Sequence, residues 1–313
     1  MNMFTLDFYT GKQYLYASHI SNASPYYTNN RTLQLQLTND IENWNNIIVS
    51  EKIYNNSLSL LDLLIDILET YTSYDSGDIR DWLLNESFDG DDDLATYMDH
   101  ITIAPFTLEE GTLLAQMNKI CNVAQMNGCY QDVFLFYSAR PLIDYITYTH
   151  IPPNKQYSTF EYSILTTNRY DGVQIGDTFE GSGNRKNIAK IETNEIMEKA
   201  TLIGVGNIKD VITQNILDDY ENGIRSCKIT IIADDYYSEN NVKTVDYSNY
   251  GAIMSLGMTL RIEQINKETK EIESVLVDKN GNDVLWQVIG STLRYEGQYL
   301  VDLELRELKR RSW

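Results

Sequence analysis

The chain has 313 residues, of which 42% are hydrophobic, and its 45 acidic and 25 basic side chains leave a net charge of −20. This hydrophobic content is sufficient for buried cores, and the length predicts about two domains. The acidic balance argues strongly against a general nucleic-acid-binding protein, because affinity for phosphate requires clustered lysine and arginine.

The cysteines and the N-terminus predict a protein of a reducing compartment. Cys121, Cys129 and Cys227 are odd in number and contain no CxxC pair, which disfavours a disulfide framework and a structural zinc site. The first residues lack a basic region followed by an apolar core, and no apolar run approaches the roughly 20 residues of a membrane span. We therefore expect no membrane-spanning segment and assembly in a cytoplasm.

The first third of the chain opens with strands. Leu33, Leu35 and Leu37 alternate with glutamine, which is the period-two pattern of a half-buried strand. A hairpin or meander is therefore predicted before a further strand. The predicted strands are residues 4–9, 13–18, 31–38 and 47–54.

A buried helix is predicted next. Residues 59–69 are apolar around most of a helical circumference, and Ser57 or Ser59 can cap the first turn. Residues 75–93 are polar, acidic and contain glycine, so they predict a loop around a short apolar turn at 82–84. We place a domain edge near residue 95.

The middle of the chain predicts a strand, a helix and a second strand. Residues 101–103 form the first strand, and Thr107 with Glu110 matches a capping box for the helix. The helix ends at Gly128, and residues 133–137 form the second strand. After this unit, residues 150–154 predict a connection, 160–166 an alternating strand, and 176–187 a glycine-rich polar loop.

The last hundred residues predict a capped amphipathic helix followed by strands. Asn207 can accept hydrogen bonds from the first turn, and Gly223 can end the helix. Asn280-Gly281 is the dipeptide of a tight hairpin turn, so residues 272–277 and 284–289 should pair across it. Strands with period two are predicted at residues 227–232, 258–263 and 298–306. Val301, Leu303 and Leu305 should lie on the apolar face. The solvent-exposed, or wet, face should carry Glu263, Asp302, Glu304 and Arg306.

These elements predict an α+β, β-rich fold of antiparallel β-barrel or sandwich domains with a few capped helices. Residues 1–95 comprise strands and a buried helix, 96–200 the strand-helix-strand unit with a connecting β region, and 201–313 a helix followed by a C-terminal barrel. The strands of residues 226–308 should form a single antiparallel barrel or sandwich.

Several short motifs fall short of a known site. Residues 89–93 begin like a calcium loop, but Leu94 and His100 stand where glycine and glutamate are needed. Residues 181–186 have the wrong spacing for a phosphate loop, and Gly204-Val205-Gly206 lacks the third glycine of a dinucleotide site. These three segments are therefore predicted to be solvated loops and turns.

The histidines and tryptophans, whose side chains could bind a metal or a sugar, do not define a metal site or a sugar-binding site. His19, His100 and His150 lie at no metal-ligand spacing from one another or from cysteine. The tryptophans at 44, 82, 286 and 313 are scattered, which favours packing over a sugar platform. The sequence predicts no catalytic, cofactor-binding or metal-ligating residue, and no cofactor.

Two segments support a resemblance to a family. Residues 102–120, with the turn at Gly128 and the strand at 133–137, resemble the strand-helix-strand unit of baseplate hub proteins of tailed bacteriophages. Residues 215–223 and the strands after them are similar to the C-terminal half of such hub, or tail-tip, proteins. There, a helix ending in a Tyr-x-Asn-Gly-like turn precedes a barrel.

The resemblance implies a structural virion protein that caps or continues the tail tube and anchors tip proteins. Such proteins usually form trimers whose subunits carry two tube-like barrel domains, and they contact tube, tip or fibre proteins. Some relatives add a peptidase or lysozyme-like domain, which we expect to be absent here or to belong to another polypeptide, because the chain ends at Trp313 directly after its last strand. The expected location is the virion tail, assembled in the host cytoplasm, with no enzymatic activity and no specific binding of nucleic acid.

Two other functions remain open from the sequence. The chain holds 23 tyrosines but eight phenylalanines, and tyrosine is enriched at interfaces, although an AT-rich genome explains the ratio equally well. A receptor- or carbohydrate-binding module of a virion fibre would use tyrosine as its platform. A cell-wall hydrolase with two carboxylates is the third possibility, and 45 acids without diagnostic spacing add little to it.

Overall fold

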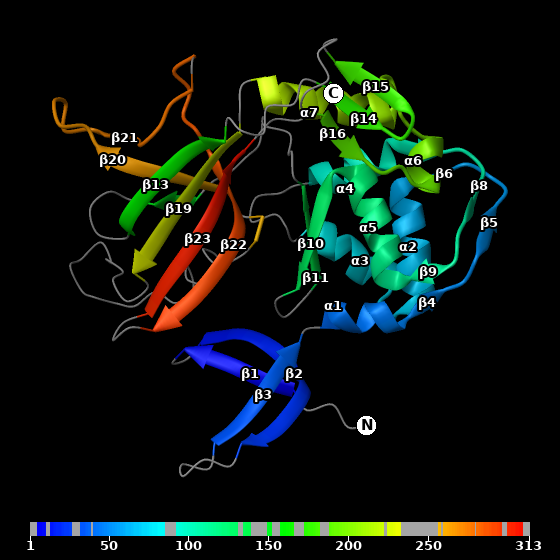
Figure 1. Cartoon of the computed structure of the whole chain (residues 1–313), viewed down its shortest axis with the longest axis horizontal. Coiled ribbons are helices and arrows are strands. Elements are labelled where there is room, and N and C mark those ends of the chain that lie inside the picture. The colour runs from blue at the N-terminus through cyan, green and yellow to red at the C-terminus, as the bar shows by residue number, and fades with distance from the viewer. Residues whose placement is uncertain are drawn as a thin grey trace.

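The structure is a computed structural model with an α+β, β-rich fold, as the sequence predicts. Figure 1 shows an N-terminal sheet, a layer of helices with small sheets, and a curled sheet beside that layer. The residues that the structure describes are 5–10, 13–26, 32–38, 40–84, 92–130, 134–138, 149–151, 157–165, 172–181, 188–221, 224–232, 256–257, 259–278, 280–295 and 299–308.

The N-terminal sheet is a three-stranded antiparallel meander, which confirms the prediction. β2 (Gln13–Tyr26) pairs with β1 (Thr5–Thr10) through its first half and with β3 (Thr32–Thr38) through its second half. β3 leads through residue 39 to α1 (Asp40–Asn43), the first element of the helical layer.

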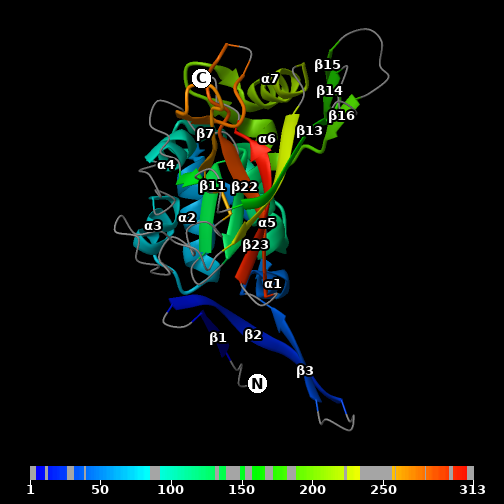
Figure 2. The ribbon, with the colours of Figure 1, turned by 90° about the vertical axis from the view of Figure 1, so that its left-hand side faces the viewer.

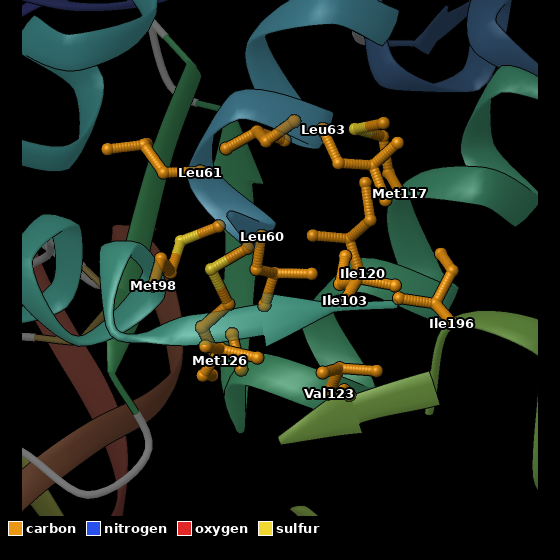
Figure 3. Close-up of a cluster of buried hydrophobic side chains, with 14 of the residues drawn as sticks. Leu60, Leu61, Leu63, Met98, Ile103, Met117, Ile120, Val123, Met126 and Ile196 are labelled. Carbon is orange, nitrogen blue, oxygen red and sulfur yellow. The ribbon is translucent and has the colours of Figure 1, made fainter. Parts of the chain in front are cut away.

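The helical layer surrounds one apolar core that extends along the chain from Trp44 to Ile212. Figure 3 shows side chains from several helices and short strands meeting in this core, among them Leu60, Met117 and Ile196. The helices of the layer are α1, η1 (Trp44–Asn46), α2 (Leu60–Tyr71), α3 (Ser76–Leu84), α4 (Asp92–Asp99), α5 (Leu113–Ala124), α6 (Glu195–Lys199) and α7 (Ile208–Glu221).

α2 forms where the sequence predicts it, and Ser59 is its cap. The Ser59 hydroxyl accepts a hydrogen bond from the Asp62 amide at 3.1 Å, which satisfies one of the first-turn donors. Its apolar residues are buried on most sides, so tertiary packing stabilises the helix more than propensity does. The buried residues are Leu60, Leu61, Leu63, Leu64, Ile65, Ile67 and Leu68.

The predicted acidic loop at residues 75–93 is wrong in part, because residues 76–84 form α3. The Asp75 carboxylate accepts hydrogen bonds from the amides of Gly77 and Asp78 at 2.8 and 2.9 Å, and so satisfies first-turn donors. Ile79 and Leu83 are four residues apart and fully buried, so they form a narrow apolar stripe among polar residues. The motif at 89–93 lies partly outside the described residues, and Asp92 opens α4.

α5 also forms, but both predicted ends are corrected. Thr112 caps it, because its hydroxyl accepts a hydrogen bond from the Ala115 amide at 3.2 Å. Thr107 instead lies in β8 (Phe106–Leu108), which pairs with β5 (Lys52–Tyr54) far away in sequence. Gln125 ends the helix in the left-handed conformation with φ of 51°, while Gly128 lies in the following strand β10 (Met126–Tyr130).

Short strands form a ribbon along the helical layer. β4 (Ile48–Val49), β5 and β6 (Leu58–Ser59) pair in turn with β9 (Gly111–Thr112), β8 and β7 (Ile101–Ile103). β7 also pairs with β17 (Ala200–Leu202), which pairs with β18 (Gly206–Asn207). The ribbon therefore holds together segments up to about a hundred residues apart in sequence, which is outside the reach of local patterns.

Two further small sheets complete this part of the molecule. β10 pairs with β11 (Phe134–Ser138), close to the predicted strand at 133–137. β14 (Gly172–Ile175) pairs with β15 (Thr178–Gly181) and with β16 (Ile188–Ile191). The predicted glycine-rich loop at 176–187 is therefore corrected in part: it begins as a hairpin, turned by Gly176 at a φ of +56°.

The curled sheet contains every described strand of residues 224–307 and two strands from earlier in the chain. Its order is β12-β20-β22-β23-β19-β13, with β21 paired to β20, and all its pairs are antiparallel except β12 with β20. His150, predicted in a connection, lies in β12. The strands are β12 (Thr149–Ile151), β13 (Tyr157–Leu165), β19 (Ile224–Ile232), β20 (Thr259–Ile265), β21 (Ile272–Ser274), β22 (Trp286–Tyr295) and β23 (Tyr299–Glu307).

Chain connectivity explains the curl. β12 and β13 are the two ends of the strand order, yet only residues 152–156 separate them. Six residue steps reach at most about 22 Å. Five strand spacings across a flat sheet amount to about 24 Å. The sheet must therefore curve to bring its ends together, and Figure 1 shows β13 returning toward β20.

The predicted hairpin around Asn280-Gly281 is correct at its turn and wrong in its strands. Gly281 has a φ of +83°, and Asp278 accepts hydrogen bonds from the amides of Asn280 and Asn282 at 2.8 Å. Around this turn, an isolated bridge joins Val277 to Asp283. Residues 272–274 pair instead with β20, which precedes them across the short turn of residues 266–271.

α7 confirms the last predicted helix. The Asn207 side chain accepts a hydrogen bond from the Lys209 amide at 2.9 Å, as a cap should. Ile208 and Ile212 are buried in the core of the helical layer. The division into 1–95, 96–200 and 201–313 remains a prediction, and this core draws residues from all three segments.

Candidate functional site

The two faces of the curled sheet have opposite character along its central strands. Val301, Leu303 and Leu305 of β23 are each 1% exposed, as the alternating pattern predicts. Asp302 and Glu304 lie on the other face, where they neighbour polar residues of β19 and β22. The sheet thus buries one face and presents the other for contact.

The polar face is hollowed over β19, β22 and β23. The hollow has a volume of about 530 Å³ and is open to solvent. Lys228 donates a short hydrogen bond to Glu304, and the Thr230 hydroxyl donates one to Asp302 at 2.6 Å. Each acid is therefore paired across the strands with a donor on β19.

Gly290 makes room for one of these acids. It lies directly opposite Glu304, and a Cβ atom at this position would come within 3.2 to 3.5 Å of the Glu304 side chain. The pairing shifts by one residue between Val288 and Gly290, which marks a β-bulge. A glycine beside a bulge thus lets the acid lie across its neighbouring strand.

The chemistry of this face is that of polar contact. The hydrogen bond to Glu304 raises the pKa of the Lys228 ammonium, so the group is charged at neutral pH and cannot act as a base. Burial raises the pKa of the Cys227 thiol on the opposite face to about 12, so it is no nucleophile at neutral pH. The face thus offers hydrogen-bonding partners to a contacting molecule.

A second charged cluster lies where β20 meets the loop before β22. Arg261 contacts Glu263 at 2.7 Å and Asp283 at 2.8 Å. The prediction that Glu263 lies on the wet face is wrong, because its side chain is 5% exposed. Arg261 supplies the charge that allows a carboxylate to be buried there.

Exposed apolar side chains gather on short ribbons and turns. Ile265 and Ile272 lie opposite each other on β20 and β21 and are 42% and 59% exposed. The turn after β17 displays Ile203 and Val205, which are flanked by glycines in the left-handed region. The ribbon along the helical layer displays Ile48 and Ile53. Exposed apolar residues in such groups are typical of contact surfaces.

The ribbon itself is held by a compact polar cluster. Asp66 of α2 accepts a hydrogen bond from the Tyr54 hydroxyl at 2.5 Å and contacts the Lys52 ammonium at 2.6 Å. Tyr54 stacks on Phe106 across the ribbon with ring centroids 5.1 Å apart. Burial, followed by the bond to Asp66, raises the pKa of Tyr54, so the hydroxyl remains a donor. These contacts fix the strand that displays Ile53.

The short glycine motifs, the histidines and the tryptophans that the sequence raises as candidates do not come together at one site in the described part of the chain. Gly181 ends β15, while 182–186 lie outside the described residues, and Gly204 lies in the turn after β17. His100 contacts the Thr96 carbonyl at 2.6 Å. Trp44 and Trp286 are buried packing residues, as expected. Across the described part of the chain, no group of three or more metal-ligating side chains meets, and none of the helices is long and apolar enough to span a membrane.

Sequence reasoning missed the hollow and the buried ion pairs. The hollow arises from pairing between strands that are far apart in sequence, such as β19 with β23, whereas Arg261 and Glu263 lie two residues apart on β20. The alternation along β23 indicates on which face Glu304 lies. It cannot show which residue of another strand lies beside Glu304. The hollow lies on β19, β22 and β23, while Ile48, Ile53, Ile203, Ile265 and Ile272 are exposed on other elements.

Comparison with known proteins gives likeness in fold. No family model and no characterised protein sequence matches the chain. Among solved structures, the tail protein from Neisseria meningitidis MC58 is similar, with a TM-score of 0.53 and 11% identity over 94% of this chain and 81% of that one.

Two further solved structures have lower scores. The prophage MuSo2 43 kDa tail protein from Shewanella oneidensis has a TM-score of 0.47 and 7% identity, covering 96% of this chain and 80% of that one. A prophage tail protein from Listeria monocytogenes EGD-e has a TM-score of 0.41 and 9% identity, covering 95% and 78%.

Proposed function

We propose that this chain is a structural protein of a bacteriophage tail, acting at the hub of the baseplate, where it caps or continues the tail tube and anchors tip proteins. The observation that carries the proposal is the likeness in fold to the tail protein from Neisseria meningitidis MC58. The likeness extends over 94% of this chain, so it concerns the whole arrangement and not one common module.

The surface supports a role in assembly. A subunit of a tail makes large permanent contacts, and such contacts are richer in apolar residues than the surface of a monomer. The exposed pairs Ile265 with Ile272 and Ile203 with Val205 stand on short, well-defined elements that can reach a neighbour. The proposed partners are other copies, as a trimer or ring, and tube, tip or fibre proteins.

The charge supports a place on the path of DNA. A net charge of −20 repels nucleic acid, so DNA can pass close to the protein without adhering. The proposed location is the virion tail, with assembly in the host cytoplasm and no specific binding of nucleic acid.

We propose neither a catalytic role nor a cofactor. The two acids that line the hollow are each hydrogen-bonded to a donor on β19, Glu304 to Lys228 and Asp302 to Thr230, which suits rigid strand pairing. A hydrolytic pair would need one carboxyl group with a raised pKa poised to donate a proton.

The test is the native mass of the purified full chain, with electron microscopy of the same sample. A trimer or a larger closed ring with a central channel supports the hub. A monomer retained on a glycan array would favour the receptor-binding alternative. Turnover of peptidoglycan that disappears in Asp302→Asn and Glu304→Gln variants would favour the hydrolase.

A further inference from the structure

Asparagine followed by glycine occurs three times in the sequence, at residues 127–128, 222–223 and 280–281. In this pair the glycine nitrogen can attack the asparagine side-chain amide, because glycine has no Cβ atom to shield its nitrogen. Two of the pairs lie in the described part of the chain, and in both the asparagine and the glycine are exposed to solvent. These two sites therefore differ in backbone structure and not in access to water.

The pair at 127–128 is held in a strand. Asn127 lies opposite Tyr137 in the ladder of β10 and β11. Gly128 lies opposite Phe136, which is fully buried, and Figures 1 and 2 show β11 beside the helices of the layer, where α3 contacts it. In a strand the main-chain N–H lies in the plane of the sheet, while the side chain stands perpendicular to it. The Gly128 nitrogen therefore cannot reach the Asn127 side chain unless the ladder breaks.

The pair at 280–281 lies in a turn. The Asp278 carboxylate accepts hydrogen bonds from the amides of Asn280 and Asn282, both at 2.8 Å, and the Gly281 amide donates to the Asp278 carbonyl at 3.1 Å. Apart from the two chain neighbours of Gly281, no described atom would lie within 4 Å of a Cβ atom at this position. Exposed turns open far more often than packed strands, and this one can open without unpairing β20 or β22. The Gly281 nitrogen and the Asn280 side chain can then approach to the roughly 3.5 Å that reaction requires.

We propose that Asn280 is a site of spontaneous deamidation, from which Asn127 is protected by its strand. The Gly281 nitrogen attacks the Asn280 Cγ atom and forms a new C–N bond, while the bond from Cγ to the side-chain nitrogen breaks. The amide proton of Gly281 passes to that nitrogen, which leaves as ammonia. Water then opens the resulting cyclic imide at one of its two carbonyl groups and gives an aspartate or an isoaspartate. Water is the only co-reactant.

The product adds charge to a turn that already carries acids. The new carboxylate lies in sequence between Asp278 and Asp283, and Asp283 contacts Arg261 at 2.8 Å. The chain, at a net charge of −20, becomes more negative by one. An isoaspartate also adds one carbon atom to the main chain of the turn. The chain therefore acquires a second, more acidic form as it ages, and this modification is independent of the proposed function.

The first test follows the two sites in one sample. The purified full chain is aged at neutral pH and digested at acid pH, where attack by the main-chain nitrogen is slow. Mass spectrometry with fragmentation then locates each deamidated residue by a mass increase of about 1 Da. Asn280 should convert at least about tenfold faster than Asn127, since the turn opens more readily than the ladder. Equal rates, or a faster rate at Asn127, overturn the inference.

Unfolding the chain supplies the control. In concentrated guanidinium chloride the ladder of β10 and β11 is lost, so the two asparagines should convert at rates within about threefold of each other. A gap that persists in the unfolded chain would assign the difference to flanking residues instead of the fold, and overturns the inference. Conversion of Asn280 in the unfolded chain alone would show that the turn protects it, with the same result.

A variant tests the opening of the turn. Asp278→Ala removes the carboxylate that accepts the amides of Asn280 and Asn282. The turn should open more often, and conversion of Asn280 should become about two- to fivefold faster. Asn127 in the same chain is the matched control and should keep its rate. An unchanged or slower conversion of Asn280 in Asp278→Ala contradicts the step in which the turn opens and overturns the inference.

Discussion

The helical layer and the curled sheet are stabilised in different ways. The layer encloses one apolar core, to which helices and short strands from Trp44 to Ile212 contribute. The central strands of the curled sheet are apolar on one face, while the other carries ion pairs and an open hollow. The difference indicates that the helical layer serves as the scaffold of the fold, whereas the sheets present surfaces for contact.

The chain passes from one region to the other three times. The chain enters the curled sheet at β12 and β13, returns to the layer for β14 to α7, and enters the sheet again at β19. Only residues 222–223 separate α7 from β19. β19 therefore follows closely in sequence after a helix that packs in the core of the layer.

The largest expected effect comes from opening the core of the layer. Leu64 of α2 is fully buried, so Leu64→Ala should lower the free energy of unfolding by about 4 kcal/mol through lost burial and a cavity. Urea unfolding of the purified chain measures this. The control is Ile53→Ala, at 63% exposed, which should stay within about 0.5 kcal/mol of wild type. Equal losses in both variants would contradict the assigned core.

A smaller loss is expected in the curled sheet. Leu303→Ala removes a side chain that is 1% exposed on β23, and about 2 to 3 kcal/mol should be lost because an open sheet relaxes around the gap more easily. The adjacent Glu304→Gln keeps the shape on the polar face and should change stability little. If Glu304→Gln were the more damaging variant, the assignment of the two faces would be reversed.

The cap of α5 tests the corrected start of that helix. Thr112→Ala removes the acceptor for the Ala115 amide and should cost about 1 kcal/mol. Thr107→Ala, at the position that the sequence pattern favours, changes an exposed residue of β8 and should cost less than about 0.5 kcal/mol. Thermal and urea unfolding compare the two. A larger loss of stability in Thr107→Ala than in Thr112→Ala would instead support a capping box that begins at Thr107.

The smallest effect concerns pH. The hydrogen bond from Lys209 lowers the pKa of Glu198 below its ordinary 4.5. A lowered pKa in the folded state adds stability above about pH 4.5, which is lost as the pH falls through the folded-state pKa. The pair is partly exposed, so its worth is below about 1 kcal/mol. The free energy of unfolding of wild type should exceed that of Glu198→Gln at pH 7 and converge with it in acid.

Elements with local signals are the ones that the sequence predicts. Ser59 and Asn207 cap helices found close to the predicted places, since the signal and the bond lie within one turn. α3 escaped prediction because Ile79 and Leu83 form a narrow apolar stripe in an acidic segment. The alternation of β23 likewise gives its two faces.

The sequence could not predict which segments pair as strands with which others. Thr107 satisfies the pattern of a cap, but pairing of β8 with β5 takes that segment into a strand. Residues 272–274 pair with β20 across a nearer turn, at residues 266–271, so two local hairpins compete for this segment. The polar hollow depends on β19, β22 and β23 together, so the pairing of Lys228 with Glu304 has no signature in either strand alone.

The central claim is that this chain is a tail hub, and the most direct measurement is an image of the assembled phage particle with the chain located in it. An epitope or gold label on the chain, read by electron microscopy, gives its position. The account predicts density on the tail axis at the end of the tube, as a closed ring of copies. Label on the capsid, or on fibres away from the axis, would contradict it.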